Sequence, residues 1–341
     1  MKKLLLSILL LSILLLNCQK AEMNKPTTSS INDLNNGWQV PLDQLVISSL
    51  PMDRIPSIDD PYFEELNDHH LNPFEKVYVY RFENTLKVYP QNILAIHEIV
   101  NDHIGDHYFA ITYCPLTASA IAWNREISGS ITEFGVSGHL YHDNLIAYDR
   151  NSQNYWSQMS LKSIKGSHTG ELLESEALLL SNAETIIQSF PKALVLVDTL
   201  THSCDSVCNG KNKASLSGDF FGIIKQEIAH EDEALLFNYD HFSDTIGIYQ
   251  FTFDNKEVLI VGSRKLQFIH AYIIQSPNLY YPVQDALPII FKDNVGNMYD
   301  LSGYIIDGPQ KGNRLTSPIS YTAHSFAWEL FFPNHTEIFE E

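Results

Sequence analysis

The sequence predicts an α+β fold dominated by strands, in which two related halves pack as one bilobal unit with pseudo-twofold character. Short runs of β-branched and aromatic residues recur between Gly, Asn or Asp turns, and the 17 Tyr and 18 Phe are typical of a sheet-rich chain. One segment has the apolar spacing of a helix. A residue pattern of the first half returns in the second half at a constant distance, which indicates an internal duplication.

The first 17 residues have the pattern of a signal peptide. Lys2 and Lys3 precede an almost uninterrupted apolar run from Leu4 to Leu16, which has the length of a signal-peptide core and is too short to span a bilayer. Cys18 follows this run as in a bacterial lipobox, although Asn17 is an atypical residue before it. We therefore expect lipidation of Cys18, and the alternative is a plain secretory signal.

The expected product is a lipid-anchored, extracytoplasmic protein of a bacterial cell envelope, with the membrane as its partner. Residues 18–37 read as a flexible tether, because they lack a hydrophobic period and contain a Pro-Thr-Thr-Ser-Ser run. The fold is expected to begin near Trp38, with a first half at 38–200 and a degenerate second half at 201–341. The net charge is −19 and no cluster of Lys and Arg stands out, so nucleic acid is not an expected partner.

Strands are predicted at 76–82, 107–113, 118–123, 130–136 and 145–148. A helix is predicted over 92–102, because apolar residues stand at 93, 96, 99 and 100 and Pro90 is suited to a helix start. On such a helix His97 and Asn101 share one face, and Glu98 and Asp102 share another.

The duplication rests on six positions that recur 142 residues later. These are Ile164, Gly166, Gly170, Leu173, Phe190 and Pro191, which return as Ile306, Gly308, Gly312, Leu315, Phe332 and Pro333. Before Ile164 and Ile306 the two halves match less closely, and Arg264 stands where a counterpart of Cys114 is expected. The second half is therefore interpreted as a copy that has lost the site residues. The alternative is a single sheet fold with two similar glycine turns.

Residues 97–158, here called the motif cluster, hold the expected site. Polar residues, glycines and prolines are frequent there among apolar residues. Ordinary core strands do not need such residues. Catalytic roles are expected for His97, Glu98, Asp102 and Cys114. Binding roles are expected for Asn101, Tyr113, Ser137, Asp149 and Trp156.

The same motifs carry a resemblance to a known family. The chain reads VYP at 88–90, HEIVND at 97–102, TYCPL at 112–116, FGVSG at 134–138, YDR at 148–150 and WSQ at 156–158. In these it resembles bacterial exported proteins with domain of unknown function 3179. The resemblance implies no mechanism. Family members often have a second cysteine where this chain has Thr117, so a dithiol pair is absent, and His139 and His142 also depart from the family pattern.

Cys114 is the candidate nucleophile. His97 would favour its thiolate, and Glu98, Asn101 or Asp102 would orient the imidazole. The competing reading is a buried core thiol, because an unpaired Cys is among the most buried residue types. Pro115 argues for a strand edge instead.

A divalent metal is the candidate cofactor. His97, Glu98, Asp102 and His103 offer donors in one segment, and His139, His142 and Asp143 offer donors in another. Since no spacing equals a known ligand box, helix capping by Asn101 and Asp102 is the alternative.

Two further readings of the motif cluster remain open. Ser137 fits a serine nucleophile elbow poorly, because His139 occupies the place of the second Gly. Aromatic residues around the turns would line a cleft in a non-catalytic binding module. These residues are Tyr113, Trp123, Tyr141 and Trp156.

The function expected from the sequence is thiol- or metal-assisted chemistry on a small molecule at this polar site. The alternative is a ligand-binding or structural lipoprotein without catalysis. Cys204 and Cys208 are expected to form a disulfide in the oxidising compartment, and a metal site that also uses His202 is the competing hypothesis.

Overall fold

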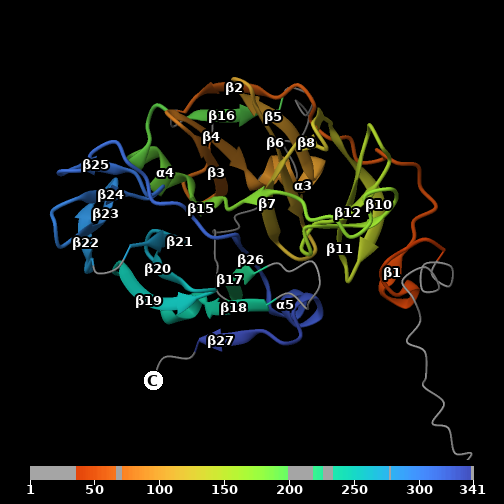
Figure 1. Ribbon diagram of the computed structural model, residues 1–341. Coiled ribbons are helices and arrows are strands. Elements are labelled where there is room, and N and C mark those ends of the chain that lie inside the picture. The colour runs from red at the N-terminus through yellow and green to blue at the C-terminus, as the bar shows by residue number, and fades with distance from the viewer. Residues whose placement is uncertain (1–35, 67–70, 199–217, 226–232, 276–277, 339–341) are drawn as a thin grey trace, which may run out of the picture. The chain divides into compact units, whose positions relative to one another are not determined.

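A computed structural model describes residues 36–66, 71–198, 218–225, 233–275 and 278–338. From Trp38 onward the chain forms one compact unit. Strands dominate it, which confirms the predicted class, and Figure 1 shows their arrangement. The division at residue 200 and the pseudo-twofold packing stay predictions. No helix in the described ranges combines the length and apolar character needed to cross a bilayer.

The central sheet has eight strands, drawn from both halves of the chain. Its order is β19 (Gly247–Phe253), β20 (Lys256–Ser263), β21 (Phe268–Ile274), β15 (Leu179–Asn182), β3 (Lys76–Phe82), β4 (Thr85–Pro90), β16 (Leu194–Val197) and β2 (Tyr62–Glu65). Helix α4 (Ala183–Ser189) follows β15 directly. Because β15 pairs with both β3 and β21, it joins the two halves.

Two four-stranded sheets and a five-stranded sheet flank this one. One has the order β14 (Ser175–Glu176), β7 (Ser119–Asn124), β6 (His107–Cys114) and β5 (Ile99–Ile104), and another has β26 (Ser320–His324), β17 (Asp219–Lys225), β18 (Glu233–Asn238) and β27 (Thr336–Ile338). The third has β1 (Leu45–Val46), β10 (Phe134–Tyr141), β11 (Asn144–Asp149), β12 (Tyr155–Ser157) and β13 (Lys162–Lys165).

The remaining elements are short. A four-stranded sheet has the order β22 (Tyr280–Ala286), β23 (Ile289–Asp293), β24 (Met298–Asp300) and β25 (Ile305–Asp307), and a small ladder joins β8 (Glu126–Ile127) to β9 (Ser130–Ile131). The other helices are α3 (Gln91–His97), α5 (Ser325–Phe331) and the 3₁₀ turns η1 (Leu42–Gln44) and η2 (Tyr239–His241).

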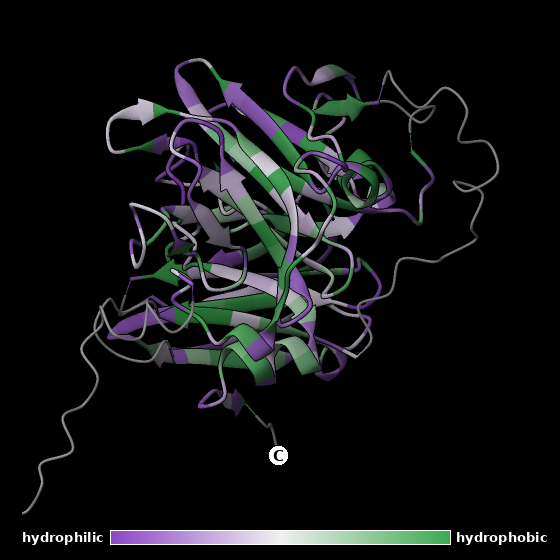
Figure 2. Cartoon of the chain, turned by 90° about the vertical axis from the view of Figure 1, so that its right-hand side faces the viewer, coloured by the Kyte–Doolittle hydropathy of each residue, from purple (hydrophilic) through white to green (hydrophobic). Residues whose placement is uncertain are grey.

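The central sheet is buried on both faces, as alternation along β3 shows. Val77 and Val79 pack with α4 and the β22–β25 sheet, whereas Tyr78 and Tyr80 pack against β6. The opposite face of β6, with Cys114, packs on β10 and β11. Figure 2 shows hydrophobic and hydrophilic residues alternating along many strands. The layers therefore stack from β10–β13, through β5–β7 and the central sheet, to β22–β25.

The strands predicted at 76–82, 107–113, 118–123 and 145–148 are confirmed with small shifts. The one predicted at 130–136 is wrong as a single strand, because it is divided between β9 and β10. The predicted helix is wrong beyond its first half. Helix α3 ends at His97, and Glu98 adopts a left-handed conformation with φ 59°. The next residues form β5, because β-branched Ile99 and Val100 find a partner in β6. Asn101 and Asp102 consequently point to opposite faces of a strand.

The local structure of the first half recurs in the second. Helices α4 and α5 each have seven residues, start 142 positions apart, and end before Phe190 and Phe332 in the same unusual conformation. Strands β16 and β27 follow them, and each adds in parallel to an antiparallel hairpin. Isolated bridges join Lys162 to Leu172 and Tyr304 to Arg314, again 142 positions apart. These elements thus follow one another in the same order in both halves, whereas β8, β9 and β14 have no counterpart among the described residues of the second.

The strand registers correct one expectation about the second copy. Cys114 pairs with Ser119 at the end of the β6–β7 hairpin, and Ser263 pairs with Phe268 at the same place in the β20–β21 hairpin. The counterpart of Cys114 is therefore Ser263, and Arg264 is the next residue. The fold accepts a serine hydroxyl at this position.

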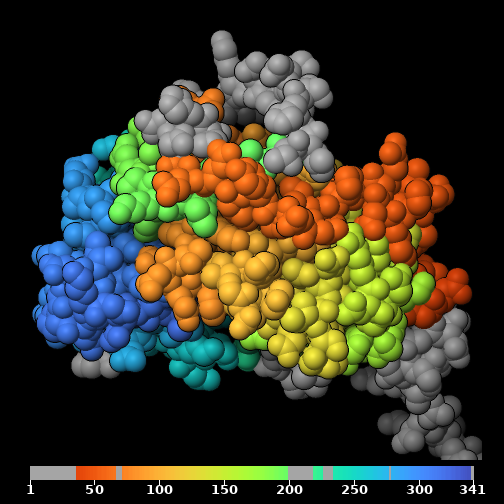
Figure 3. Space-filling model, turned by 90° about the horizontal axis from the view of Figure 1, so that it is seen from above, coloured from red at the N-terminus to blue at the C-terminus, as the bar shows by residue number. Residues whose placement is uncertain are grey.

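Residues 45–66, here called the N-terminal strap, cross several of these sheets. β1 pairs with β10, Ile58 bridges to Val100 in β5, and β2 closes the central sheet beside β16. In Figure 3 the red-to-orange residues of this part of the chain extend across the face beside the yellow residues of the first half. The strap thus covers the strands that carry the motif cluster.

Candidate functional site

The strap is held by residues that the sequence predicted to form the site. The Asn101 side chain donates to Asp59 Oδ1 (2.7 Å) and to the Phe134 carbonyl (2.8 Å), and its Oδ1 accepts from the Phe134 amide (2.9 Å). Its backbone amide donates to the Ile58 carbonyl. With only 1% exposed, Asn101 joins the strap, β5 and β10. Its observed role is a structural connector.

His97 also contacts the strap. Its Nδ1 lies 2.8 Å from the Pro56 carbonyl and its Nε2 lies 3.2 Å from Asp198 Oδ2, so both ring nitrogens are engaged. The neighbouring Glu98 carboxyl is mostly buried, and desolvation raises its pKa to about 7. The Glu98 carbonyl accepts from the Tyr113 amide. Glu98 is therefore bonded to the residue that precedes Cys114 in β6.

Asp102 lies on the opposite face of β5 from Asn101, in a buried ion pair. Its carboxylate accepts from Lys87 Nζ at 2.7 and 2.9 Å, from the Tyr89 hydroxyl at 2.6 Å and from the His103 amide at 2.7 Å. Asp102 is thus saturated with hydrogen bonds, and it faces the core between β6 and the central sheet. Cys114 faces the other layer.

Cys114 is 2% exposed, and its Sγ donates weakly to the Asp143 carbonyl at 3.7 Å. Burial raises the pKa of this thiol, and hydrogen bonds from Thr117 oppose the rise without cancelling it. Within the described ranges no hydrogen bond or ion pair links His97, Glu98 and Cys114 to one another. The catalytic assignment of these residues stays a prediction, and the geometry gives each of them structural contacts.

The Asp149 turn explains several of the expected binding residues. Oδ1 accepts from the Ser152 amide and hydroxyl, and Oδ2 accepts from Asn154 and from Trp156 Nε1 (3.0 Å). Burial would raise the Asp149 pKa, but the hydrogen bonds from Ser152, Trp156 and Asn154 lower it. Asp293 accepts the same kinds of bonds from Asn297 and from Tyr299. The turn is therefore part of the repeated fold.

Gly166 completes this turn. At φ 115° it approaches Asn154 so closely that an added Cβ would lie 2.1 Å from the Asn154 side-chain oxygen. Gly308 makes the equivalent approach to Asn297 in the second half. The recurring glycines in the sequence pattern thus have a steric cause.

Ser137 and the aromatic candidates also have structural partners. The Ser137 hydroxyl donates to the Ile146 carbonyl, and Tyr113 accepts from Gln91 Nε2 at 2.8 Å. Tyr113, Trp123 and Trp156 are buried, so they do not line an open aromatic cleft.

The expected metal donors do not gather. The part of the chain that the structure describes contains no group of three or more His, Cys, Asp or Glu residues suited to hold a metal ion. His139 Nδ1 instead accepts from the Ser48 amide in the strap, and burial lowers its pKa. Cys18, His202, Cys204 and Cys208 lie outside the described residues.

Several hollows in the described surface were not predicted, and one of about 660 Å³ is lined by residues of α4, the β20–β21 turn and β22. Two others adjoin β3 and β17. The first, here called the tyrosine site, has a free volume of about 10 Å³, the space of one water molecule. It is lined by Val79, Tyr80, Arg81, Glu176, Ala177, Leu179, His270, Ser302 and Arg314. These residues come from β3, β14, β15, β21 and the loops beside β24 and β25. No sequence motif could unite them, because only strand pairing between the halves brings them together.

Tyr80 is the hydrogen-bonding centre of this site. Its hydroxyl donates to Glu176 Oε1 at 2.8 Å and lies 2.6 Å from His107 Nε2. Since a phenol has one proton and a carboxylate only accepts, His107 Nε2 is the donor to Tyr80. The His107 ring stacks on Phe82 with a centroid distance of 4.0 Å, which fixes its orientation.

His270 and Arg314 form the other wall. His270 Nε2 lies 2.8 Å from Ser317 Oγ, whereas its buried Nδ1 has no partner. Burial and the Arg314 charge lower the His270 pKa to about 3, so the ring is neutral near pH 7. Arg314 donates to the Ser302 and Arg81 carbonyls and is otherwise exposed. An unsatisfied buried ring nitrogen beside an exposed guanidinium is suited to bind a polar ligand.

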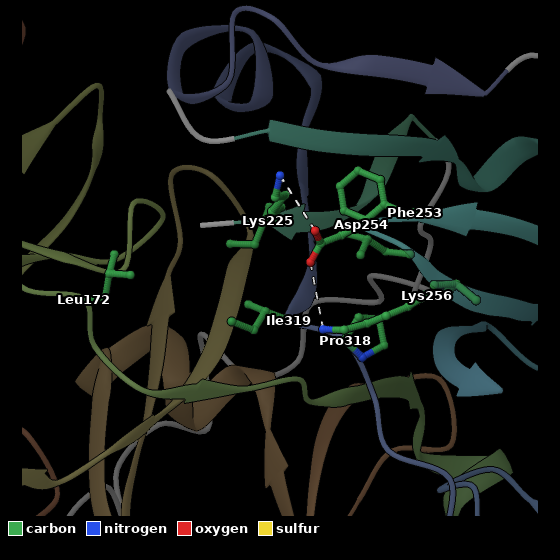
Figure 4. Close-up of a pocket in the computed structure, with 10 residues that line it drawn as sticks. Leu172, Lys225, Phe253, Asp254, Lys256, Pro318 and Ile319 are labelled. Carbon is green, nitrogen blue, oxygen red and sulfur yellow. Dashed lines mark ion pairs between the residues drawn. The ribbon is translucent and has the colours of Figure 1, made fainter. Parts of the chain in front are cut away.

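The second hollow, here called the lysine pocket, has a volume of about 260 Å³ (Figure 4). It is lined by Leu172, Ile223, Ile224, Lys225, Phe253, Asp254, Lys256, Val258, Pro318 and Ile319. A third hollow of about 220 Å³ includes Asp149, but the internal bonds of the Asp149 carboxylate leave that group little capacity for a ligand.

We expect Asn101→Ala to lower the free energy of unfolding by about 2–4 kcal/mol, because buried donors and acceptors on Phe134 lose their partner. Urea unfolding would measure this. Asn151→Ala removes one exposed side-chain bond, to the Ile131 carbonyl, and should cost well under half as much. Equal losses in the two variants would contradict the connector role of Asn101.

We expect Cys114 to react with iodoacetamide at pH 8 far more slowly in the folded protein than in urea, because burial both shields the thiol and raises its pKa. Peptide mass spectrometry would follow this residue separately from the other cysteines. Similar rates in the folded and unfolded states would show an accessible, reactive thiol.

The model of one protein family, Protein of unknown function (DUF3179), matches residues 52–206. This segment begins within the strap and contains the whole motif cluster. No curated protein and no solved structure matches the chain significantly. The resemblance expected from the motifs is confirmed, because residues 52–206 are similar to the DUF3179 family.

Proposed function

We propose that this protein is a lipid-anchored, extracytoplasmic lipoprotein that binds a small molecule with an anionic oxygen group at the tyrosine site. The unpartnered Nδ1 of His270, buried next to Arg314, is the observation that carries the proposal. The signal-like segment and Cys18 support the anchor.

Non-covalent binding accounts for the geometry better than thiol chemistry. The thiol of Cys114 is buried with a raised pKa, Ser263 occupies the equivalent position, and both His97 ring nitrogens have partners. A thiol nucleophile needs the opposite, namely exposure and a lowered pKa. The runner-up hypothesis from the sequence, a binding lipoprotein, therefore becomes the leading one.

The polar groups of the site indicate the ligand class. If the Ser317 hydroxyl donates to His270 Nε2, then Nδ1 carries the ring proton and has no acceptor among the described residues. His270 lines the hollow, so a ligand oxygen there would supply that acceptor. The free volume of about 10 Å³ accepts one atom of oxygen size. Arg314 lies at the rim, where a guanidinium favours a carboxylate or phosphate. One ligand oxygen would occupy the hollow, and the anionic group would contact the Arg314 guanidinium.

The anchor is tested with Cys18→Ser in the full-length chain. We expect the unsubstituted protein to sediment with membranes and its N-terminal peptide to carry an acyl mass, and the variant to lose both. Cys114→Ser serves as the control and should keep both. A Cys18→Ser protein that still sediments with membranes, together with an unmodified N-terminus in the parent, would refute lipidation.

The binding site is tested with acetate and inorganic phosphate as probes, on the full chain in detergent. Saturation-transfer NMR should detect acetate contact, and phosphate should compete with it. Arg314→Gln should weaken acetate binding about tenfold, as expected for a lost charge-assisted hydrogen bond.

Two matched variants control this experiment. Arg264→Gln removes an arginine near the exposed Asp244, and Cys114→Ser removes the thiol, so both should bind acetate like the parent. If acetate does not bind, or if Arg264→Gln has the same effect as Arg314→Gln, the site assignment is wrong. Loss of binding in Cys114→Ser would restore the thiol hypothesis.

A further inference from the structure

The third hollow, here called the histidine pocket, lies between the β8–β9 hairpin and the Asp149 turn. It has a volume of about 220 Å³, and seven of its eight lining residues are polar, with Ile127 as the exception. Ser128 and Ser130 come from the hairpin, and His168 comes from the turn that follows β13. A ligand of this pocket therefore has to be rich in hydrogen-bonding groups.

His168 is the residue of this pocket at which the two halves differ most clearly. Its amide donates to Asn154 Oδ1 at 2.9 Å, and the amide of Gln310, 142 positions later, donates to Asn297 Oδ1 at 2.9 Å. The Gln310 side chain also stays in this turn, because its Oε1 accepts from Asn297 Nδ2 at 3.0 Å. The His168 side chain instead lines the pocket. The shared turn thus needs the backbone amide at this position, but it does not need an imidazole.

Glu171 orients the imidazole of His168. The Nδ1 atom lies 2.8 Å from Glu171 Oε2, and since a carboxylate only accepts, Nδ1 carries a ring proton. In the neutral imidazole Nε2 is then an acceptor, and it has no protein partner within the described ranges. The pair adds little to stability, because the Glu171 side chain is 54% exposed. Asn313 stands at the position equivalent to Glu171, so the pair belongs to the first half alone.

The β8–β9 hairpin adds hydroxyl groups to the pocket. Ser128 and Ser130 are exposed, and in the part of the chain that the structure describes no protein group bonds to their hydroxyls. The hairpin has no counterpart among the described residues of the second half, so the shared framework does not explain it. Because a hydroxyl both donates and accepts, these two side chains are suited to bond to ligand hydroxyls.

The charges of the pocket disfavour an anion and give a cation little to bind. The ionised Asp149 carboxylate repels an anion, and the chain has a net charge of −19. The same carboxylate already accepts from Ser152, Asn154 and Trp156, so it has little capacity for a ligand ammonium group. The other polar groups of the lining are hydroxyls, one side-chain amide and the imidazole of His168. They favour an uncharged ligand.

We propose that the histidine pocket binds a neutral, polyhydroxylated molecule of monosaccharide size. One ligand hydroxyl donates to His168 Nε2, and others bond to Ser128 and Ser130. The volume of about 220 Å³ lies below the range of about 300–1,000 Å³ that is typical of drug-sized ligands, which fits a single sugar ring. The inference goes beyond the proposed function, because it assigns a second site for an uncharged ligand.

Glucose, galactose, N-acetylglucosamine and ribose are the probes, used with saturation-transfer NMR on the full chain in a detergent without a sugar head group. We expect saturable binding of at least one of them, and much weaker binding of glucuronate, which adds a carboxylate to the glucose ring. His168→Gln should weaken sugar binding about tenfold and Ser130→Ala about threefold, the effects of losing one hydrogen bond each. The fold should accept His168→Gln, because Gln310 occupies the equivalent position.

The His168 ring supplies a second readout. In protein with ¹⁵N-labelled histidine at pH 8, its Nε2 should resonate as an unprotonated nitrogen and should shift when the bound sugar is added. The signal is identified by its absence from the spectrum of His168→Gln. A histidine that serves only the fold would not respond to the sugar.

His335→Gln is the matched control, because His335 also pairs with a glutamate, with Nε2 3.3 Å from Glu337 Oε1, and it lies outside the pocket. This variant should bind sugar like the parent. Arg314→Gln should also leave sugar binding unchanged, and acetate should not compete with the sugar, which separates this proposal from the one on the tyrosine site. Thermal unfolding of each variant confirms that it is folded.

Four results would overturn the proposal. They are absence of saturable binding for every neutral sugar, binding of glucuronate as tight as theirs, unchanged affinity in His168→Gln, and an equal loss of affinity in His335→Gln and His168→Gln.

Discussion

The Asn101 side chain imposes the constraint on which the architecture of the first half depends. Its amide reaches the strap through Asp59 and reaches β10 through both polar backbone groups of Phe134, while its own backbone belongs to β5. Three segments distant in sequence are therefore fixed by one buried group. Since the two bonds to Phe134 satisfy buried backbone groups, removing the amide leaves both groups unsatisfied at once.

Other polar residues of the motif cluster also connect the strap to the sheets. His97 bonds to Pro56, Arg150 forms ion pairs with Asp59 and Glu133, and Tyr148 donates to Asp53. On the other face of β5, Lys87 and Asp102 form a buried pair between two layers. These residues of the motif cluster thus connect the strap to the sheets and the sheets to one another, and their assignment to an active site stays a prediction.

Two of the hollows in the described surface lie where the two halves differ in sequence. The two halves share a glycine turn, the helix pair α4 and α5 and several strand registers, so shared residues such as Asp149 and Asp293 are explained by the fold. Tyr80 and Ile223 stand at equivalent positions of the β3–β15 and β17–β26 registers, so these hollows share their place but not their side chains. The residues that differ at these equivalent positions are therefore not explained by the shared turns and helices, and the ligand proposal starts from them.

The sequence by itself determined the strand-dominated class, most strand positions and the recurring turn geometry, because alternation, glycine placement and turn residues are local properties. Its motifs also indicated the resemblance to the family whose model matches residues 52–206. The helix predicted from the apolar spacing is wrong at 98–102, because β5 forms there by pairing with β6. Only the tertiary structure decided which polar residues face each other. Tyr80, Glu176, His270 and Arg314 meet through long-range ladders, and burial, not residue type, set the pKa of Cys114 and the role of Asn101.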